Sequence, residues 1–300
     1  MSKTTKWVIG VAAALVFFFG LFLLMVFSWV LSPEDEDVVS SSGQRVAVVE
    51  LRETITVSDD IVRQLKKFRE QNAVKAIVLR VESPGGGVAA SQEIYEEVRK
   101  TREAGTPVVV SMGSVAASGG YYVSCGASRI VANPGTLTGS IGVIMQFIGV
   151  SDLLRKLGID ESTIKTGKFK DAGSPFRKVT PEDRVYFNAL VDDVYDQFVA
   201  VVAQERHLQK SFVRKYADGR VFTGRQAYTL GFVDTLGTME DAITIAARLG
   251  GISGKPAVVR EVRRKAFLDR LLGDAASEIT RFRQEVLSQP ILQYKLTSPY

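Results

Sequence analysis

A serine in a run of small residues is a candidate nucleophile. Ser118 lies in SMGSVAASGGYYVSCGAS, residues 111–128, directly after the apolar run PVVVSM. Gly119 and Gly120 let another backbone approach it closely, and a serine at the first turn of a helix is well placed to attack a carbonyl held over that turn. The same position suits a helix N-cap serine. Spacing alone does not choose the nucleophile, because four more serines compete: Ser111, Ser114, Ser124 and Ser128.

A glycine run provides a candidate oxyanion hole. The segment VESPGGGVAA, residues 81–90, stands where an apolar strand ends and a helix begins. Free backbone N–H groups at a helix N-terminus favour a negative oxygen. The alternative is a tight turn that simply needs glycine. The run lacks the G-K-[ST] ending of a Walker A loop and the G-x-G-x-x-G of a Rossmann motif.

A serine nucleophile needs a base, and histidine is scarce. His207 is the single histidine and lies in QERHLQK, which is typical of a solvated helix end. A lysine can replace it only when neutral, and lowering a lysine pKa from about 10.4 to roughly 8 requires about 3 kcal/mol of desolvation. The segment STIKTGKFKDAGSPF offers three lysines, Lys165, Lys168 and Lys170.

Metal and cofactor chemistry are not expected. One cysteine, Cys125, and one histidine provide no disulfide, no multi-cysteine metal site and no H-E-x-x-H motif. Without the two N-terminal lysines, 36 basic residues face 33 acidic ones, and this net charge of +3 is too mild to indicate a nucleic-acid partner. We therefore expect no cofactor, no metal and no nucleic acid.

The elements that must position these residues alternate along the chain. Apolar runs at 45–51, 74–81 and 107–112 alternate with amphipathic runs at 58–71 and 90–105. This alternation predicts an α/β fold with largely parallel strands, and the unbroken apolar runs predict a sheet covered by helices on both faces. We further expect a helix through Cys125, a strand at 129–133, a kinked sheet over 135–144, a long helix at 181–206 and a strand near 256–262.

The N-terminus predicts a membrane anchor. Trp7 to Leu31 is a stretch of 25 residues without a charge, which as a helix would rise roughly 37 Å and cross a hydrocarbon core of about 30 Å. The exit, FSWVLSPEDED, has no A-x-A cleavage pattern. Lys3 and Lys6 before the span and four acidic residues after it predict a cytoplasmic N-terminus and an exported bulk.

These patterns divide the chain into five parts. We expect a cytoplasmic N-terminus at 1–6, a transmembrane anchor at 7–31, a linker at 32–44, a catalytic domain at 45–254 and a C-terminal extension at 255–300. The extension includes an arginine-rich amphipathic stretch, residues 263–287. That stretch fits a membrane surface, a partner subunit or an ordinary solvated helix face.

Four motifs in order resemble the signal peptide peptidase A family in its short, single-domain form. They are SPGGG, ASGGYY, NPGTLTGSIGV and GKFKDAGSPFR, within a match from about Arg45 to Gly250. The resemblance implies a fold similar to crotonase and Clp protease, a single-pass protein of the inner (cytoplasmic) membrane, and a homo-oligomeric ring in which the serine of one subunit can meet the lysine of the next. It implies degradation of signal peptides that remain after preprotein processing.

The resemblance also implies roles for individual residues. The family's nucleophile falls on Ser118, its general base on Lys170 and its auxiliary serine on Ser140. Its oxyanion hole falls on Gly85, Gly86 and the N–H of Gly119.

Three other functions compete with this one. A related serine/lysine membrane peptidase would act on other membrane proteins. A crotonase-like acyl-CoA enzyme would need acidic catalytic residues and a CoA site. An inactive membrane scaffold would be indifferent to loss of Ser118.

Overall fold

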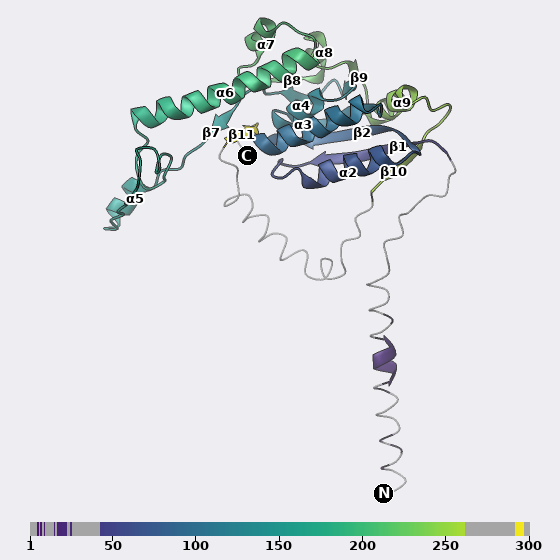
Figure 1. Ribbon diagram of the computed structural model, residues 1–300, viewed down its shortest axis with the longest axis horizontal. Helices are drawn as coiled ribbons and strands as arrows, with labels where there is room; N and C mark the ends of the chain where they lie inside the picture. The colour runs from purple at the N-terminus through teal and green to yellow at the C-terminus, as the bar shows by residue number, and fades with distance from the viewer. Residues whose placement is uncertain are drawn as a thin grey trace. The chain divides into compact units, whose positions relative to one another are not determined.

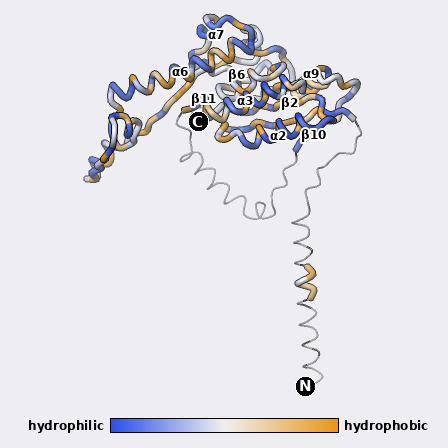
Figure 2. The backbone as a smooth tube through the Cα atoms, viewed as in Figure 1, coloured by the Kyte–Doolittle hydropathy of each residue, from blue (hydrophilic) through white to orange (hydrophobic). Residues whose placement is uncertain are grey.

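The computed structural model describes residues 43–261 and 292–296, together with separate positions between 5 and 25. The chain divides into two compact units, Met1–Ser41 and Ser42–Tyr300. In the first unit the described positions include 17–22, a helical and apolar stretch (Figure 2). No helix among the described residues is both long enough and apolar enough to cross a membrane. Most of the predicted anchor at 7–31, and the amphipathic stretch at 263–287, lie outside the described residues.

A mostly parallel sheet forms the centre of the second unit (Figure 1). Its main path joins six strands in the order β10 (Ala257–Arg260), β1 (Arg45–Arg52), β2 (Val74–Ser83), β4 (Val108–Ala117), β5 (Arg129–Ala132) and β9 (Thr235–Leu236), each parallel to its neighbour. The end of β4 also pairs in parallel with β6 (Leu137–Gly139), which pairs antiparallel with β8 (Val221–Thr223). The predicted α/β fold with largely parallel strands is confirmed.

Helices cover both faces of this sheet. On one face Val46, Val48, Ala76 and Val78 pack against α9 (Met239–Leu249). The alternate residues Ala47, Val49, Ile77 and Leu79 belong to a larger core on the other face. That core includes side chains of four helices, α2 (Asp59–Glu70), α3 (Val88–Glu103), α4 (Gly119–Cys125) and α6 (Pro181–Glu205). The continuous apolar strands are therefore buried from both sides, as their sequence predicts.

The remaining elements are short. They are the helices α5 (Ser151–Lys156), α7 (Lys210–Tyr216) and α8 (Gly224–Thr229), and a second sheet of three strands. In this sheet β11 (Leu292–Lys295) lies between β3 (Gly85–Gly87) and β7 (Ile144–Met145) and is antiparallel to both. The last described strand of the chain therefore pairs directly with the glycine run.

Candidate active site

Ser118 occupies a strained turn between β4 and α4. It is 1% exposed and has φ 53° and ψ −114°, a backbone conformation that costs a non-glycine residue energy. Its N–H donates to the Gly139 carbonyl at 2.7 Å, and its carbonyl accepts from Tyr122 N at 2.8 Å. Although Ser118 stands at the N-cap position, its side chain makes no capping hydrogen bond. A strained strand-to-helix turn that leaves the hydroxyl uncommitted is typical of a nucleophilic serine.

Three of the competing serines have structural roles. Ser124 Oγ donates to the Gly120 carbonyl at 2.7 Å, as expected for a hydroxyl inside a helix. Ser111 Oγ accepts from Arg80 at 2.9 Å and Ser128 Oγ from the Val108 N–H at 3.2 Å. Ser114 is exposed. Geometry therefore favours Ser118 over each of them.

The glycine run packs directly against the Ser118 turn. Gly85 has φ 98°, and a Cβ there would lie 2.7 Å from Gly119 N. A Cβ on Gly119 would lie 3.2 Å from Gly86 N. The Gly85 N–H already donates to Ser83 Oγ at 3.2 Å, whereas the Gly119 N–H is the first of α4 and has no partner within that helix. Of the three predicted oxyanion donors, the Gly119 N–H is thus the one without a partner in its own element, whereas Gly86 pairs with Tyr294 of β11.

Ser140 lies next to the Ser118 turn through the backbone. It follows Gly139, whose carbonyl accepts the Ser118 N–H, and it is 6% exposed. Its φ is 50°, so it shares with Ser118 a conformation unusual for serine. Two strained serines thus end two adjacent parallel strands, β4 and β6.

β11 runs past this turn as an extended strand. Tyr294 pairs with Gly86, and the Tyr294 carbonyl oxygen would lie 2.1 Å from a Cβ on Gly85. The side chain of Tyr294 is fully buried, stacks on Tyr122 with centroids 5.1 Å apart, and donates its hydroxyl to the Val194 carbonyl at 3.2 Å. A peptide carbonyl and an aromatic pocket therefore meet beside the glycine run.

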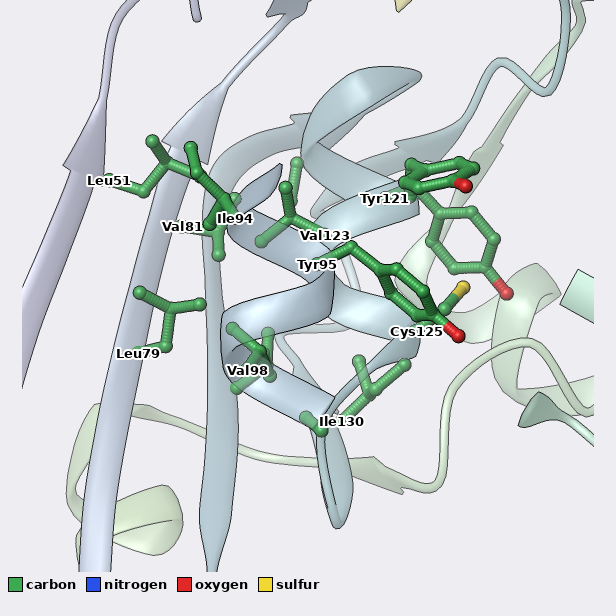
Figure 3. Packing of buried hydrophobic residues seen from close by; sticks show 14 of the residues in the cluster. Leu51, Leu79, Val81, Ile94, Tyr95, Val98, Tyr121, Val123, Cys125 and Ile130 are labelled. Atoms are coloured by element: carbon green, nitrogen blue, oxygen red, sulfur yellow. The ribbon is translucent and has the colours of Figure 1, made fainter. Parts of the chain in front are cut away.

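The helix that follows Ser118 packs on a hydrophobic core, in which Figure 3 shows Tyr95, Tyr121 and Cys125 among aliphatic side chains. Tyr122 lies edge-on to Tyr95 and to Phe198, with centroids 5.2 and 5.0 Å apart. Burial raises the pKa of Tyr122 to about 12 and that of the Cys125 thiol to about 12, so both remain protonated at neutral pH. Cys125 is a structural residue and offers no thiolate for catalysis.

The three candidate lysines lie on an arm, residues 143–180, that precedes α6. Lys170 is exposed. Lys165 pairs with Asp171 at 2.5 Å and Lys168 with Glu182 at 3.2 Å. In the part of the chain that the structure describes, Lys170 makes no ion pair. It is therefore the candidate base whose amine is least engaged.

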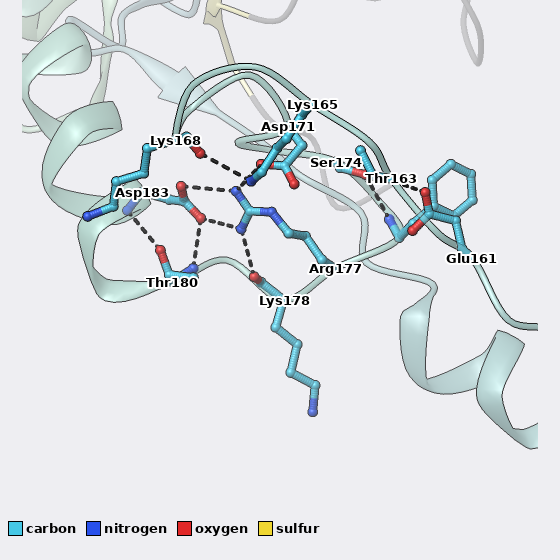
Figure 4. A network of polar contacts seen from close by, with 11 residues as sticks. Glu161, Thr163, Lys165, Lys168, Asp171, Ser174, Arg177, Lys178, Thr180 and Asp183 are labelled. Atoms are coloured by element: carbon cyan, nitrogen blue, oxygen red, sulfur yellow. Dashed lines mark hydrogen bonds and ion pairs between the residues drawn. The ribbon is translucent and has the colours of Figure 1, made fainter.

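An ionic cluster fastens the arm to the start of α6 (Figure 4). Arg177 donates to Asp183 with both terminal nitrogens and to Asp171 at 3.0 Å. These hydrogen bonds lower the pKa of both carboxyl groups. Asp183 also completes a capping box with Thr180. The loop that contains Lys170 is thus held at one end of a helix of 25 residues.

The structure does not bring Ser118 and Lys170 together within one chain. α6 contacts α4 through Phe198, which lies 15 residues beyond Asp183, or roughly 22 Å along the helix axis. In Figure 1 the arm extends beyond the N-terminal end of α6, away from α4. The exposed His207 lies just beyond the C-terminal end of the same helix.

Sequence patterns do not identify two residues that lie near the site, Tyr294 and Glu82. Tyr294 comes close to the glycine run through a pairing across some 200 residues, and local periodicity does not report such contacts. Glu82 accepts hydrogen bonds from the backbone of β4. The acidic residue before SPGGG in the sequence is the one hint of that role.

Comparison with known proteins defines the class. The profile of peptidase family S49 matches residues 100–253, and that of Clp protease matches residues 38–136. A protein of Synechocystis named as a protease is 42% identical over 215 residues, which cover 71% of this chain and 77% of that protein. A protein of Enterococcus faecium named for signal peptide peptidase SppA is 43% identical over 184 residues, 61% of this chain and 54% of that protein.

A further relative is Protease 4 of Salmonella typhi, 36% identical over 242 residues, and the matched region spans only 38% of its length. Among solved structures, ClpP1 of Listeria monocytogenes aligns over 65% of this chain and 94% of its own at 16% identity and a TM-score of 0.44. The assignment does not rest on that weak likeness.

The fold and these relatives define a serine peptidase. The chain belongs to peptidase family S49, which includes the proteins named SppA and Protease 4.

Proposed function

We propose that the chain is an endopeptidase of the inner membrane that uses Ser118 as nucleophile and Lys170 as general base to degrade signal peptides left after preprotein processing. One observation gives the proposal its strongest support. Ser118 is buried in a strained backbone conformation, and its hydroxyl makes no capping hydrogen bond. It lies beside backbone N–H groups of the glycine run and of α4. That arrangement supports acyl transfer.

The proposed reaction proceeds in two halves. Neutral Lys170 takes the Ser118 proton while Oγ attacks a peptide carbonyl, whose oxyanion is stabilised by N–H groups of Gly86 and Gly119, with Gly85 shaping the turn. The lysine then protonates the leaving amine. Water, deprotonated by the same lysine, hydrolyses the acyl-enzyme, and Ser140 helps to hold the lysine.

The lysine comes, in this proposal, from a neighbouring copy of the chain. A lysine that acts as a base must be shielded from water, so the exposed Lys170 needs a partner surface to exclude water. The arm is suited to such a contact because it exposes apolar side chains, among them Ile148, Leu157 and Ile164 at 80, 64 and 100%. A homo-oligomeric ring would repeat this contact at every interface.

Extended peptides fit the site by strand addition. β11 shows that a strand can lie between β3 and β7, with alternate side chains on opposite sides. We propose that substrate occupies the same position. An apolar signal peptide suits the aromatic pocket formed by Tyr122 and Phe198. A related activity on other membrane proteins would use the same chemistry and would be separated by substrate profiling.

The remaining parts keep their proposed roles. Residues 7–31 would anchor the protein with residues 1–6 in the cytoplasm, residues 32–44 would be the linker, and residues 45–254 would hold the catalytic domain outside the cytoplasm. The run of 25 uncharged residues supports this topology.

The full chain in detergent, assayed with a fluorogenic apolar peptide, tests the proposal. Ser118→Ala and Lys170→Ala should each lower kcat by more than about 1000-fold, whereas Lys168→Ala should not. Coexpressed Ser118→Ala and Lys170→Ala chains should regain activity, because random assembly pairs an intact serine with an intact lysine at about one interface in four. Full activity of either single variant would remove that residue from the mechanism.

A further inference from the structure

The strand that ends in Ser118 contains a bulge. Val81 of β2 pairs with Met112 of β4, and Ser83 pairs with Ala116. Three residues of β4, 113–115, therefore stand opposite a single residue of β2, which is Glu82. Such a bulge bends a strand and redirects the residues beyond it.

β4 also changes partner at this bulge. Before it, Val109 to Met112 pair with β5, and from its last residue onward, Val115 to Ala117 pair with β6. β6 ends at Gly139, directly before Ser140. The bulge thus sets the register between the ends of β4 and β6, from which both Ser118 and Ser140 project.

The carboxylate of Glu82 fills the bulge. It accepts from Ser114 N at 3.0 and 2.9 Å and from Val115 N at 3.1 Å. A Cβ on Gly113 would come within 1.6 Å of Glu82 Oε2, so position 113 leaves room for the carboxylate only because it is glycine. An ionised carboxylate is an acceptor only, with enough lone pairs for both amides.

Neighbouring side chains secure the carbonyl groups of the same segment. Thr136 and Thr138 donate to the carbonyls of Gly113 and Ala116 at 2.6 and 2.7 Å. Arg80 donates to the Met112 carbonyl at 3.2 Å and lies 3.9 Å from Glu82. Of these partners, Glu82 is the one that binds backbone amides of the bulge.

We infer that Glu82 is a positioning residue for peptide cleavage, because its carboxylate fixes the β4 bulge and thereby aims Ser118 at the substrate carbonyl. The inference rests on the proposed role of Ser118 as nucleophile. Glu82 does not touch the substrate, and it acts through Ala116 and Ala117, which separate the bulge from Ser118.

Glu82→Gln in the full chain tests this. The amide keeps the shape but replaces one carboxylate oxygen with an NH₂ group, which faces the Ser114 N–H instead of accepting from it. We expect kcat to fall between about 10- and 100-fold while KM stays within about twofold, since small misplacement of a reacting group costs this much. The rate of Ser118 labelling by a fluorophosphonate should fall by the same factor. Gly113→Ala, which displaces the carboxylate from the other strand, should reproduce both effects.

Glu97→Gln is the matched control. Glu97 lies on α3, is more deeply buried than Glu82 and pairs with Arg69 at 2.6 Å. It has no contact with the bulge. Glu97→Gln should lower the melting temperature and leave kcat per folded chain unchanged. Wild-type kcat and labelling in folded Glu82→Gln, or an equal loss of kcat in Glu97→Gln, would overturn the inference. A Ser118→Ala chain that still cleaves peptide would instead overturn the proposed function.

Discussion

At the scale of single residues, the site depends on backbone conformations that its side chains disfavour. Ser118 and Ser140 both have positive φ, and each directly follows the end of a strand, β4 and β6. Strain of this kind persists only where surrounding packing enforces it. Next to the Ser118 turn that packing is aromatic, with Tyr122, Phe198 and Tyr294 in mutual contact. The backbone conformation of Ser118 therefore depends on the rigidity of the packed rings next to it.

Phe198→Ala tests this dependence on packing. Phe198 is fully buried and contacts both Tyr122 and Tyr294, so its removal leaves a cavity that the rigid rings cannot fill. We expect a loss of about 3 to 5 kcal/mol in the free energy of unfolding, measured by urea denaturation. Val185→Ala on the same helix, at a side chain 71% exposed, should change it by less than about 0.5 kcal/mol. Similar losses at both positions would contradict the packing argument.

At the scale of elements, local patterns predict most of the sheet and its helices. The strands at 45–51 and 74–81 and the helices at 58–71 and 181–206 are confirmed as β1, β2, α2 and α6. Apolar runs without alternation correctly predict a sheet buried on both faces. β4 is longer than its apolar run, since the bulge carries it past Met112 to Ala117.

Contacts between distant segments could not be predicted. The pairing of β11 with the glycine run and the distance of Lys170 from Ser118 depend on how elements meet in space, which periodicity does not encode. Spacing likewise could not separate Ser118 from its neighbours or Lys170 from Lys168. In the structure, hydrogen bonds and ion pairs engage several of the competitors.

β11 yields a prediction at this scale. If substrate takes the strand position between β3 and β7, β11 competes with it. A chain that ends at residue 291 should then have a several-fold higher kcat/KM for short apolar peptides, mainly through a lower KM. A chain that ends at Leu296 keeps β11 and is the control. Equal KM values for the two chains would show that substrate binds elsewhere.

The arm should respond to acid. The pKa values of Asp183 and Asp171 are lowered by hydrogen bonds, chiefly from Arg177. Carboxylates with lowered pKa stabilise the folded arm above their unfolded pKa of about 4 and lose that effect as pH falls further. Hydrogen-exchange protection factors over 165–183 should therefore be equal at pH 7 and pH 5.5 and lower at pH 3.

Arg177→Gln provides the control for the acid response. Without the guanidinium the carboxyl groups lose the main cause of their lowered pKa. In this variant the hydrogen-exchange protection factors over 165–183 should be low at every pH. Wild-type protection at pH 3 equal to that at pH 7 would mean that the ionic cluster does not hold the arm.

At the scale of the whole molecule, the second unit separates the two residues of the proposed serine/lysine pair. Its sheet and α4 present the serine and the donors, while the arm presents the lysine at the far end of α6. Under the proposed mechanism, one chain alone holds an incomplete site. Completion by a second copy would reconcile the separation with serine peptidase activity and would account for the apolar surface of the arm.

Specific activity should therefore depend on enzyme concentration. A site shared between copies is lost when the assembly dissociates, so dilution should reduce activity per chain in step with the mass measured by light scattering. Ile164→Lys places a charge on a fully exposed apolar residue of the arm. It should shift this transition to at least about tenfold higher concentration, equivalent to about 1.4 kcal/mol of lost contact. Leu249→Lys, at the end of α9 on the opposite face of the sheet, should leave the transition unchanged. Constant activity per chain through dissociation would mean that one copy completes its own site by moving the arm, and the lysine would then have to cross the length of α6 to reach Ser118.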